Sequence, residues 1–106
     1  MIMLCTENGG MEMFKSDYFE LGMQVVTAGI HSAMEMPMFA YEVGLCMKRY
    51  CNKDWGVMDE EDKETNNQAL IDGNRIMGAY ETCKGKIWII TEANRSVTTI
   101  LFPDEY

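Results

Sequence analysis

Three cysteines and the only histidine of this chain are its candidates for metal binding. Cys46 and Cys51 stand five positions apart at the end of an expected helix, and Cys83 ends an expected strand. Thiolate and imidazole are the ligands of structural zinc, so these cysteines and His31 would suffice for a four-ligand zinc site. Their spacing matches no common zinc motif. Zinc is therefore a cofactor hypothesis that depends on the tertiary structure.

The same residues offer little for catalysis. A nucleophile paired with a general base would have to use His31, and its neighbour Ser32 does not face it on a helix. One histidine also leaves little general acid–base equipment. We therefore expect no enzyme and no catalytic residue. A small hydrolase or metal enzyme built on the cysteines is the alternative.

The densest charge in the chain is an acidic run. Of the six residues from 59 to 64, five are acidic: Asp59, Glu60, Glu61, Asp62 and Glu64. The run lacks the ligand spacing and central glycine of a calcium-binding EF loop. Acidic residues favour the start of a helix, which is the simpler explanation. Displayed on a surface, the same carboxylates could imitate phosphates and occupy a basic nucleic-acid-binding channel of another protein.

The overall charge favours a protein partner. The chain has 106 residues, with 17 acids and 9 bases, for a formal net charge of −8. A negative net charge repels phosphate backbones, so we expect no direct binding of nucleic acid. A basic protein surface would be attracted, although solubility alone also explains an acidic chain. The sequence has no membrane-spanning segment and no export signal, so we expect a cytoplasmic protein without membrane contact.

Residues 19–106 are expected to form a single α+β domain. Residues 1–18 show no sustained period and are predicted to be a flexible or loosely docked extension, with an edge strand in the first four residues as the alternative. Apolar spacing predicts a strand at residues 21–28 and helical segments at residues 31–36, 38–51 and 59–72. It predicts three more strands at residues 75–83, 86–92 and 95–102. Short turns make the last three strands an antiparallel meander. We therefore predict two to three helices packed on a small antiparallel sheet.

Two residue types leave their role open. Trp55 lies in the loop between the two longer helices, where it is either a core residue or an exposed interface anchor. Eleven methionines are many for this length, and eight of them lie in the first 38 residues. They serve either as core filler or as a flexible surface for protein binding.

From about residue 21 onward, the chain resembles a family of short proteins encoded on bacterial plasmids, integrative elements and phages. The matching residues are Asp54-Trp55-Gly56, Glu61-Asp62, Asn66, the run KIWIITEA at 86–93, Arg95-Ser96, Thr98-Thr99, Pro103 and Glu105-Tyr106. The family usually has a histidine before the loop and a glycine at its start, where this chain has Tyr50 and Lys53. A role assigned to that histidine therefore does not carry over.

The resemblance implies a partner by analogy. Mobile elements carry small acidic proteins that disarm host defences, and several anti-CRISPR proteins look like this chain in size and charge. We therefore expect an inhibitor that binds a type II CRISPR effector nuclease and blocks its binding of target DNA. The five acids of residues 59–64 would supply charge, and Trp55 would be the anchor. The alternative is an accessory protein that binds a plasmid replication or transfer protein.

Overall fold

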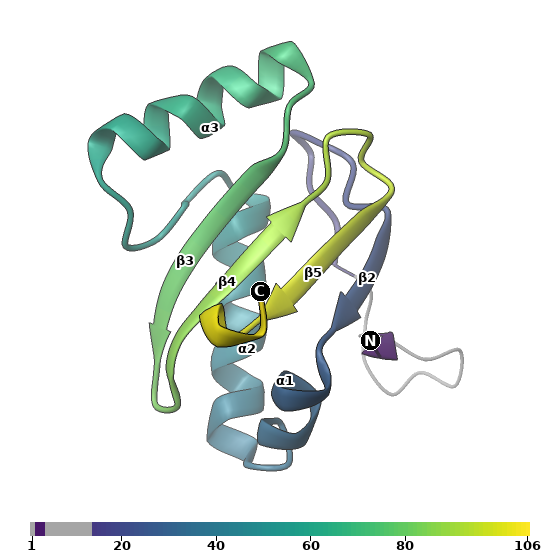
Figure 1. Cartoon of the computed structure of the whole chain (residues 1–106), viewed down its shortest axis with the longest axis vertical. Helices are drawn as coiled ribbons and strands as arrows, with labels where there is room; N and C mark the ends of the chain where they lie inside the picture. Colours follow the sequence, from purple (N-terminus) through teal and green to yellow (C-terminus); the bar gives the residue numbers. More distant parts are fainter. Residues whose placement is uncertain (1, 4–13) are drawn as a thin grey trace.

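The computed structural model describes residues 2–3 and 14–106 and has an α+β fold. In chain order the elements are β1 (Ile2–Met3), β2 (Met23–Val26), α1 (Ala28–Ala33), α2 (Pro37–Cys51), α3 (Glu60–Asp72), β3 (Ile76–Thr82), β4 (Gly85–Thr91), β5 (Val97–Leu101) and the 3-10 turn η1 (Pro103–Glu105). Helix α2 covers one face of the sheet, η1 lies on the other face, and α3 crosses one end (Figure 1). The predicted fold class is confirmed.

The sheet is mixed, with the strand order β1-β2-β5-β4-β3. The predicted meander is confirmed, because β3, β4 and β5 pair antiparallel. The prediction of an antiparallel sheet is wrong for one pair: β2 runs parallel to β5, with Val26 beside Ile100. A parallel neighbour needs a long crossover, and here the three helices and two strands of the meander lie between β2 and β5.

Part of the predicted N-terminal extension is docked on the domain. Ile2 and Met3 pair with β2, which confirms the edge-strand alternative for these two residues. The backbone of Phe14 exchanges two hydrogen bonds with the side chain of Gln24, at 3.1 and 2.7 Å. Ser16 Oγ donates to the carbonyl of Cys51 at 2.7 Å. Residue 1 and residues 4–13 lie outside the described residues.

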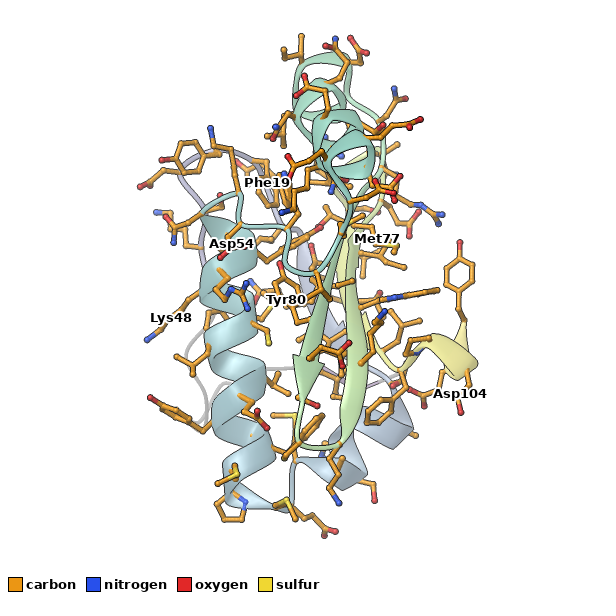
Figure 2. All side chains as sticks on the ribbon, turned by 90° about the vertical axis from the view of Figure 1, so that its left-hand side faces the viewer. Phe19, Lys48, Asp54, Met77, Tyr80 and Asp104 are labelled. Carbon is orange, nitrogen blue, oxygen red and sulfur yellow. The ribbon has the colours of Figure 1, made fainter. Side chains whose placement is uncertain are left out.

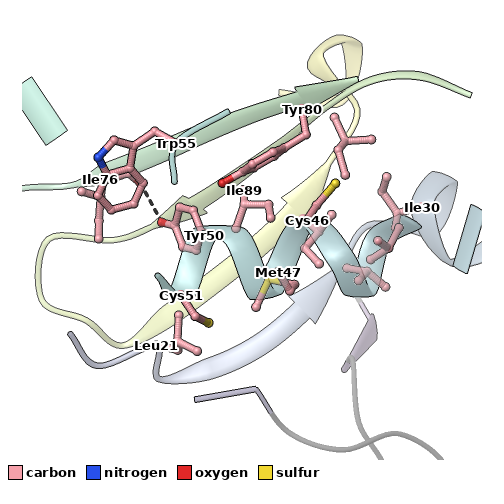
Figure 3. Close-up of a cluster of buried hydrophobic side chains, with 14 of the residues drawn as sticks. Leu21, Ile30, Cys46, Met47, Tyr50, Cys51, Trp55, Ile76, Tyr80 and Ile89 are labelled. Carbon is pink, nitrogen blue, oxygen red and sulfur yellow. Dashed lines mark hydrogen bonds between the residues drawn. The ribbon is translucent and has the colours of Figure 1, made fainter. Parts of the chain in front are cut away.

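The core forms between α2 and the sheet, as the apolar spacing of residues 38–51 predicts. The side chains of Phe39, Val43, Met47 and Tyr50 are at most 1% exposed and belong to one buried hydrophobic cluster, in which Figure 3 labels Met47 and Tyr50. Pro37 stands at the start of α2, where the missing backbone N–H is harmless. Lys48 is exposed to solvent, whereas Glu42 contacts the β3–β4 turn and the Arg49 guanidinium lies over the Tyr80 ring of β3. The polar residues of α2 therefore flank its core face or face solvent.

Hydroxyl groups cross this core in a chain. The Tyr50 hydroxyl lies 2.7 Å from Thr91 Oγ1, which lies 2.7 Å from Thr98 Oγ1. Thr98 in turn donates to the carbonyl of Leu21 at 2.7 Å. Each buried hydroxyl therefore has a partner, as burial of a polar group requires. Burial raises the pKa of Tyr50 far above its ordinary value, so the hydroxyl stays protonated. No helix among the described residues is long and apolar enough to cross a membrane.

Candidate acidic interface on helix α3

Helix α3 begins and ends where its sequence predicts. Asp59 is the N-cap, and its Oδ1 accepts a hydrogen bond from the backbone N–H of Asp62 at 2.8 Å. Gly73 ends the helix in the left-handed conformation, with φ of 77°. The carboxylates of the first turn lie beside the positive end of the helix dipole, which stabilises this end.

Unlike α2, helix α3 has almost no apolar face. Its only buried residues are Asn66 and Ala69, and its Ile71 side chain is 78% exposed. A short helix that is polar all round is marginal in isolation. Specific hydrogen bonds therefore have to hold α3 on the domain.

Asn66 makes the central attachment of α3. Its Nδ2 donates to the carbonyl of Met77 at 2.7 Å, and the N–H of Met77 donates to Asn66 Oδ1 at 3.1 Å. The amide thus pairs with the backbone of β3 as a neighbouring strand would. Beside it, Trp55 Nε1 donates to Asn67 Oδ1 at 3.0 Å. These bonds fix the middle of α3 against β3 and against the loop that carries Trp55.

Arg95 fixes the C-terminal end of α3. Its guanidinium donates to the carbonyl oxygens of Ala69 at 3.2 Å, Asn74 at 2.7 Å and Glu92 at 3.1 Å. A cation at the last carbonyls of a helix complements their partial negative charge. The β4–β5 loop thereby grips the C-terminal end of α3. Arg95 itself adopts φ of 58°, so the loop takes a sharp turn to place it.

With α3 attached at its middle and its C-terminal end, its acidic residues face solvent. The side chains of Asp59, Glu60, Glu61, Asp62 and Glu64 are all exposed. Glu60 and Glu61 lie four and three positions before Glu64, so the three share one side of the helix. The sheet-facing side is the opposite one, where Asn66 lies. Helix α3 projects beyond the end of the sheet, so this acidic side is open to a partner (Figure 2).

Few positive charges neutralise these carboxylates within the described part of the chain. The one ion pair there is Lys63 Nζ with Glu60 Oε1 at 3.8 Å, a loose contact on the surface. The other ion pair of the described residues, Arg49 with Asp54 at 2.8 Å, belongs to the loop before the helix. The acidic side of α3 therefore keeps most of its charge.

Trp55 is a core residue, and its predicted use as an exposed anchor is wrong. Its side chain is 2% exposed and packs edge-on against Tyr50, with ring centroids 5.5 Å apart. The next residue, Gly56, pairs with Ala79 of β3, and a Cβ at Gly56 would clash with the Ala79 carbonyl. This contact pulls the loop onto the edge of the sheet and the tryptophan with it into the core.

The four-ligand zinc site is not formed either. Cys46 and Cys51 lie on the core face of α2, and burial raises the pKa of each thiol to about 11. Cys83 is exposed at the β3–β4 turn, and His31 is exposed on α1. No group of three or more His, Cys, Asp or Glu in residues 14–106 could hold a metal ion. The five-residue spacing of Cys46 and Cys51 places both side chains in the core and does not form a metal site.

Two features of this region were missed by sequence reasoning. The first is the anchoring role of Asn66 and Arg95, for which their place in the family pattern was the only signal. The second is a shallow groove of about 580 Å³ beside the C-terminal half of α3. Tyr18, Leu70 and the exposed Ile71 give it an apolar lining, and Lys53 Nζ lies 4.2 Å from the ring centroid of Tyr18.

Many residues that carry the resemblance have structural roles. Asp54 bonds Arg49, and Glu105 accepts hydrogen bonds from the hydroxyl of Thr27 at 2.6 Å and the N–H of Gly29 at 3.1 Å. Tyr106 packs edge-on against Trp88 on the face opposite α2. Glu61 and Asp62 are also among the residues that carry the resemblance, but both are exposed and have no such packing role.

Comparison of the chain with family models, with curated proteins and with solved structures gives no match.

Proposed function

We propose that this protein is a non-enzymatic inhibitor that binds a basic, nucleic-acid-binding surface of a bacterial protein through α3. The partner class we propose is a type II CRISPR effector nuclease, whose binding of target DNA the protein would block in the bacterial cytoplasm. The observation that carries the proposal is the exposed carboxylates of Glu60, Glu61 and Glu64 on one side of a helix that is attached at its middle and at its C-terminal end.

The charge density of α3 supports imitation of a phosphate backbone. Six residues of an α-helix rise about 9 Å. Residues 59–64 carry five acids and one lysine, a net charge of four. This gives one negative charge per roughly 2 Å, close to the value of about 1.7 Å along duplex DNA. A channel that attracts DNA would therefore attract this end of the protein.

The attachment of α3 also supports the proposal. A binding surface that is ordered before it meets its partner loses less conformational entropy on association. Asn66 and Arg95 order α3 with bonds on its sheet-facing side and at its C-terminal end, which leaves the acidic side free. The exposed Ile71 lies farther along the same helix and adds an apolar contact next to the charges.

The proposal is tested by DNA cleavage with purified type II CRISPR nucleases. Each nuclease is loaded with guide RNA, and the protein is added either before or after target DNA. We expect inhibition when the protein is added first and little inhibition once the DNA is bound, because both compete for one surface. Equal inhibition in either order would contradict blocked DNA binding. No inhibition and no binding across a panel of type II nucleases would contradict the partner class.

A further inference from the structure

The side of α2 that faces away from the sheet carries apolar residues outside the buried core cluster. The side chains of Met38, Tyr41 and Leu45 are 64%, 68% and 41% exposed. They lie three and four positions apart, so they share one side of the helix with Lys48, which points away from the sheet (Figure 2). This spacing is typical of the seam between two packed helices. We call these four residues the outer side of α2.

A hollow lies against the outer side of α2. It has a volume of about 260 Å³, and residues of α2 line it together with the aromatic ring of Phe14. Tyr41, Leu45 and Lys48 form part of this lining, so the hollow and the exposed apolar residues make one continuous surface. Single exposed apolar residues are common on monomers, whereas a continuous apolar surface marks a contact site for another chain.

Gly44 lies in the interior of α2, at this hollow. Glycine destabilises a helix interior relative to alanine. Among the described residues, packing does not require it: the nearest atom to a Cβ at Gly44 would be Phe14 Cζ at 4.0 Å, an ordinary contact. The close approach of a second chain to the helix explains the missing side chain.

The charges of α2 suit a second copy of the same helix that runs in the opposite direction. Glu42 is the only acid of α2, and its two bases are Lys48 and Arg49, so the helix has a net charge of +1 in a chain of −8. Two copies therefore repel each other less through α2 than through their acidic surfaces. Exposed Glu35 lies two residues before α2, and Lys48 lies in its last turn. An antiparallel pair brings these opposite charges together and aligns the helix dipoles favourably.

We propose that the outer side of α2 is the interface of a symmetric homodimer with antiparallel α2 helices. A twofold axis beside Tyr41 places Leu45 opposite Met38 of the second copy, and Tyr41 of the second copy then fills the hollow. The same register places Lys48 opposite Glu35 of the second copy, because each charge lies three positions outside that apolar pair. Every contact occurs twice, so the assembly closes at two copies.

The first test is sedimentation equilibrium of the full chain under reducing conditions, at concentrations up to about 500 µM, which includes the range of weak, small interfaces. We expect a reversible equilibrium between the 12.1 kDa chain and a species of twice that mass. A monomer over the whole range would overturn the proposal. No nuclease takes part, and the acidic side of α3 lies outside this interface, so the result does not depend on the proposed function.

Three lysine variants locate the interface at matched net charge. Leu45→Lys places a charge in the seam, and Gly44→Lys fills the hollow with a residue that favours a helix, so each is expected to weaken dimerisation by about tenfold or more. Ile71→Lys, at a position on α3 that is 78% exposed, is the control and dimerises like the unmodified protein. Circular dichroism of dilute samples checks that all three variants are folded. Equal dimerisation of Leu45→Lys and Ile71→Lys would contradict the assignment.

Exchange of the two end charges tests the antiparallel register. Glu35→Lys makes the chain less acidic and Lys48→Glu makes it more acidic, so net charge alone would strengthen the first dimer and weaken the second. The paired charges predict instead that each single variant weakens the dimer about threefold. The double variant, whose net charge is unchanged, restores the affinity because the pair is rebuilt in reverse. A double variant as weak as both losses combined would overturn the antiparallel dimer.

Discussion

At the scale of single residues, side chains that pair with backbone groups hold this fold together. Asn66 joins α3 to β3, Arg95 caps the end of α3, and Glu105 ties the C-terminal turn to the start of α1. Each of them bridges elements that few apolar contacts connect. Loss of such a side chain leaves its backbone partners unpaired, which is more destabilising than the loss of an average hydrogen bond.

Asn66→Ala tests the attachment of α3. The substitution removes both bonds to Met77 and leaves a partly buried N–H and C=O without a partner. We expect the free energy of unfolding to fall by about 1–3 kcal/mol, measured by urea denaturation. The exposed Gln68→Ala on the same helix is the control and changes stability by less than about 0.5 kcal/mol. Equal effects of the two variants would contradict the anchoring role of Asn66.

The pair of Arg49 and Asp54 predicts a pH dependence. The hydrogen bond from Arg49 holds the pKa of Asp54 below its ordinary value. A carboxyl with a lowered pKa in the folded protein stabilises it above the unfolded pKa, and this contribution is lost as the pH falls below about 4. Both side chains are about half exposed, so the contribution is below about 1 kcal/mol.

Thermal unfolding of the unmodified protein and of Asp54→Asn measures this contribution. Near pH 7 the melting temperature of the variant is expected to be lower by a few degrees. The two curves should approach each other as the pH falls below about 4, where Asp54 becomes neutral. A constant difference from pH 7 to pH 2 would show that the effect is not the charge of Asp54.

At the scale of elements, the loop at residues 54–57 shapes the edge of the sheet. Gly56 has φ of 82° and approaches the Ala79 carbonyl so closely that no side chain fits. The N–H of Ala79 donates to the Trp55 carbonyl at 3.0 Å, and the N–H of Val57 donates to the Ala79 carbonyl at 2.7 Å. The loop therefore shields part of the β3 edge and seats Trp55 in the core.

Comparison of Gly56→Ala with Gly73→Ala isolates this close approach. The two glycines have similar left-handed φ angles of 82° and 77°, and a Cβ at Gly73 would meet nothing within 4 Å. Gly73→Ala is expected to destabilise by about 1 kcal/mol, the conformational term alone. Gly56→Ala should exceed it by about 2 kcal/mol or more, because the loop must leave β3. Similar unfolding free energies for the two variants would refute the close contact.

Local patterns predicted the elements better than their arrangement. The acidic cap and Gly73 predicted α3, and the apolar spacing of residues 38–51 predicted α2, because these signals act within a few residues. The direction of β2 beside β5 has no local signal, since it depends on where a long crossover returns. For the same reason, spacing could not reveal that Trp55 is buried by the contact of Gly56 with Ala79.

At the scale of the whole molecule, the acidic side of α3 lies at one end. The carboxylates of α3 extend past one end of the sheet, and the β3–β4 turn meets α2 at the other end (Figure 1). Substitutions of exposed residues on α3 are therefore expected to leave the other end unchanged, because effects of distant sites are additive.

Charge reversal on α3 tests the central claim, that its acidic side binds a basic surface. The variant Glu60→Lys, Glu61→Lys, Glu64→Lys has a matched control in Glu35→Lys, Glu81→Lys, Asp104→Lys, whose residues are also exposed. Both variants change the formal net charge from −8 to −2. Lysine in the first turn of a helix opposes its dipole by about 0.3–1 kcal/mol per residue. Circular dichroism therefore first confirms that both variants are folded.

The decisive measurement is the affinity of these two variants and the unmodified protein for a purified type II CRISPR nuclease at two salt concentrations. The account predicts that the α3 variant binds on the order of 100-fold more weakly, that the control binds within a few-fold of the unmodified protein, and that salt weakens binding. Equal affinity of the α3 variant and the control would contradict it, because net charge and not the acidic side of α3 would then govern association.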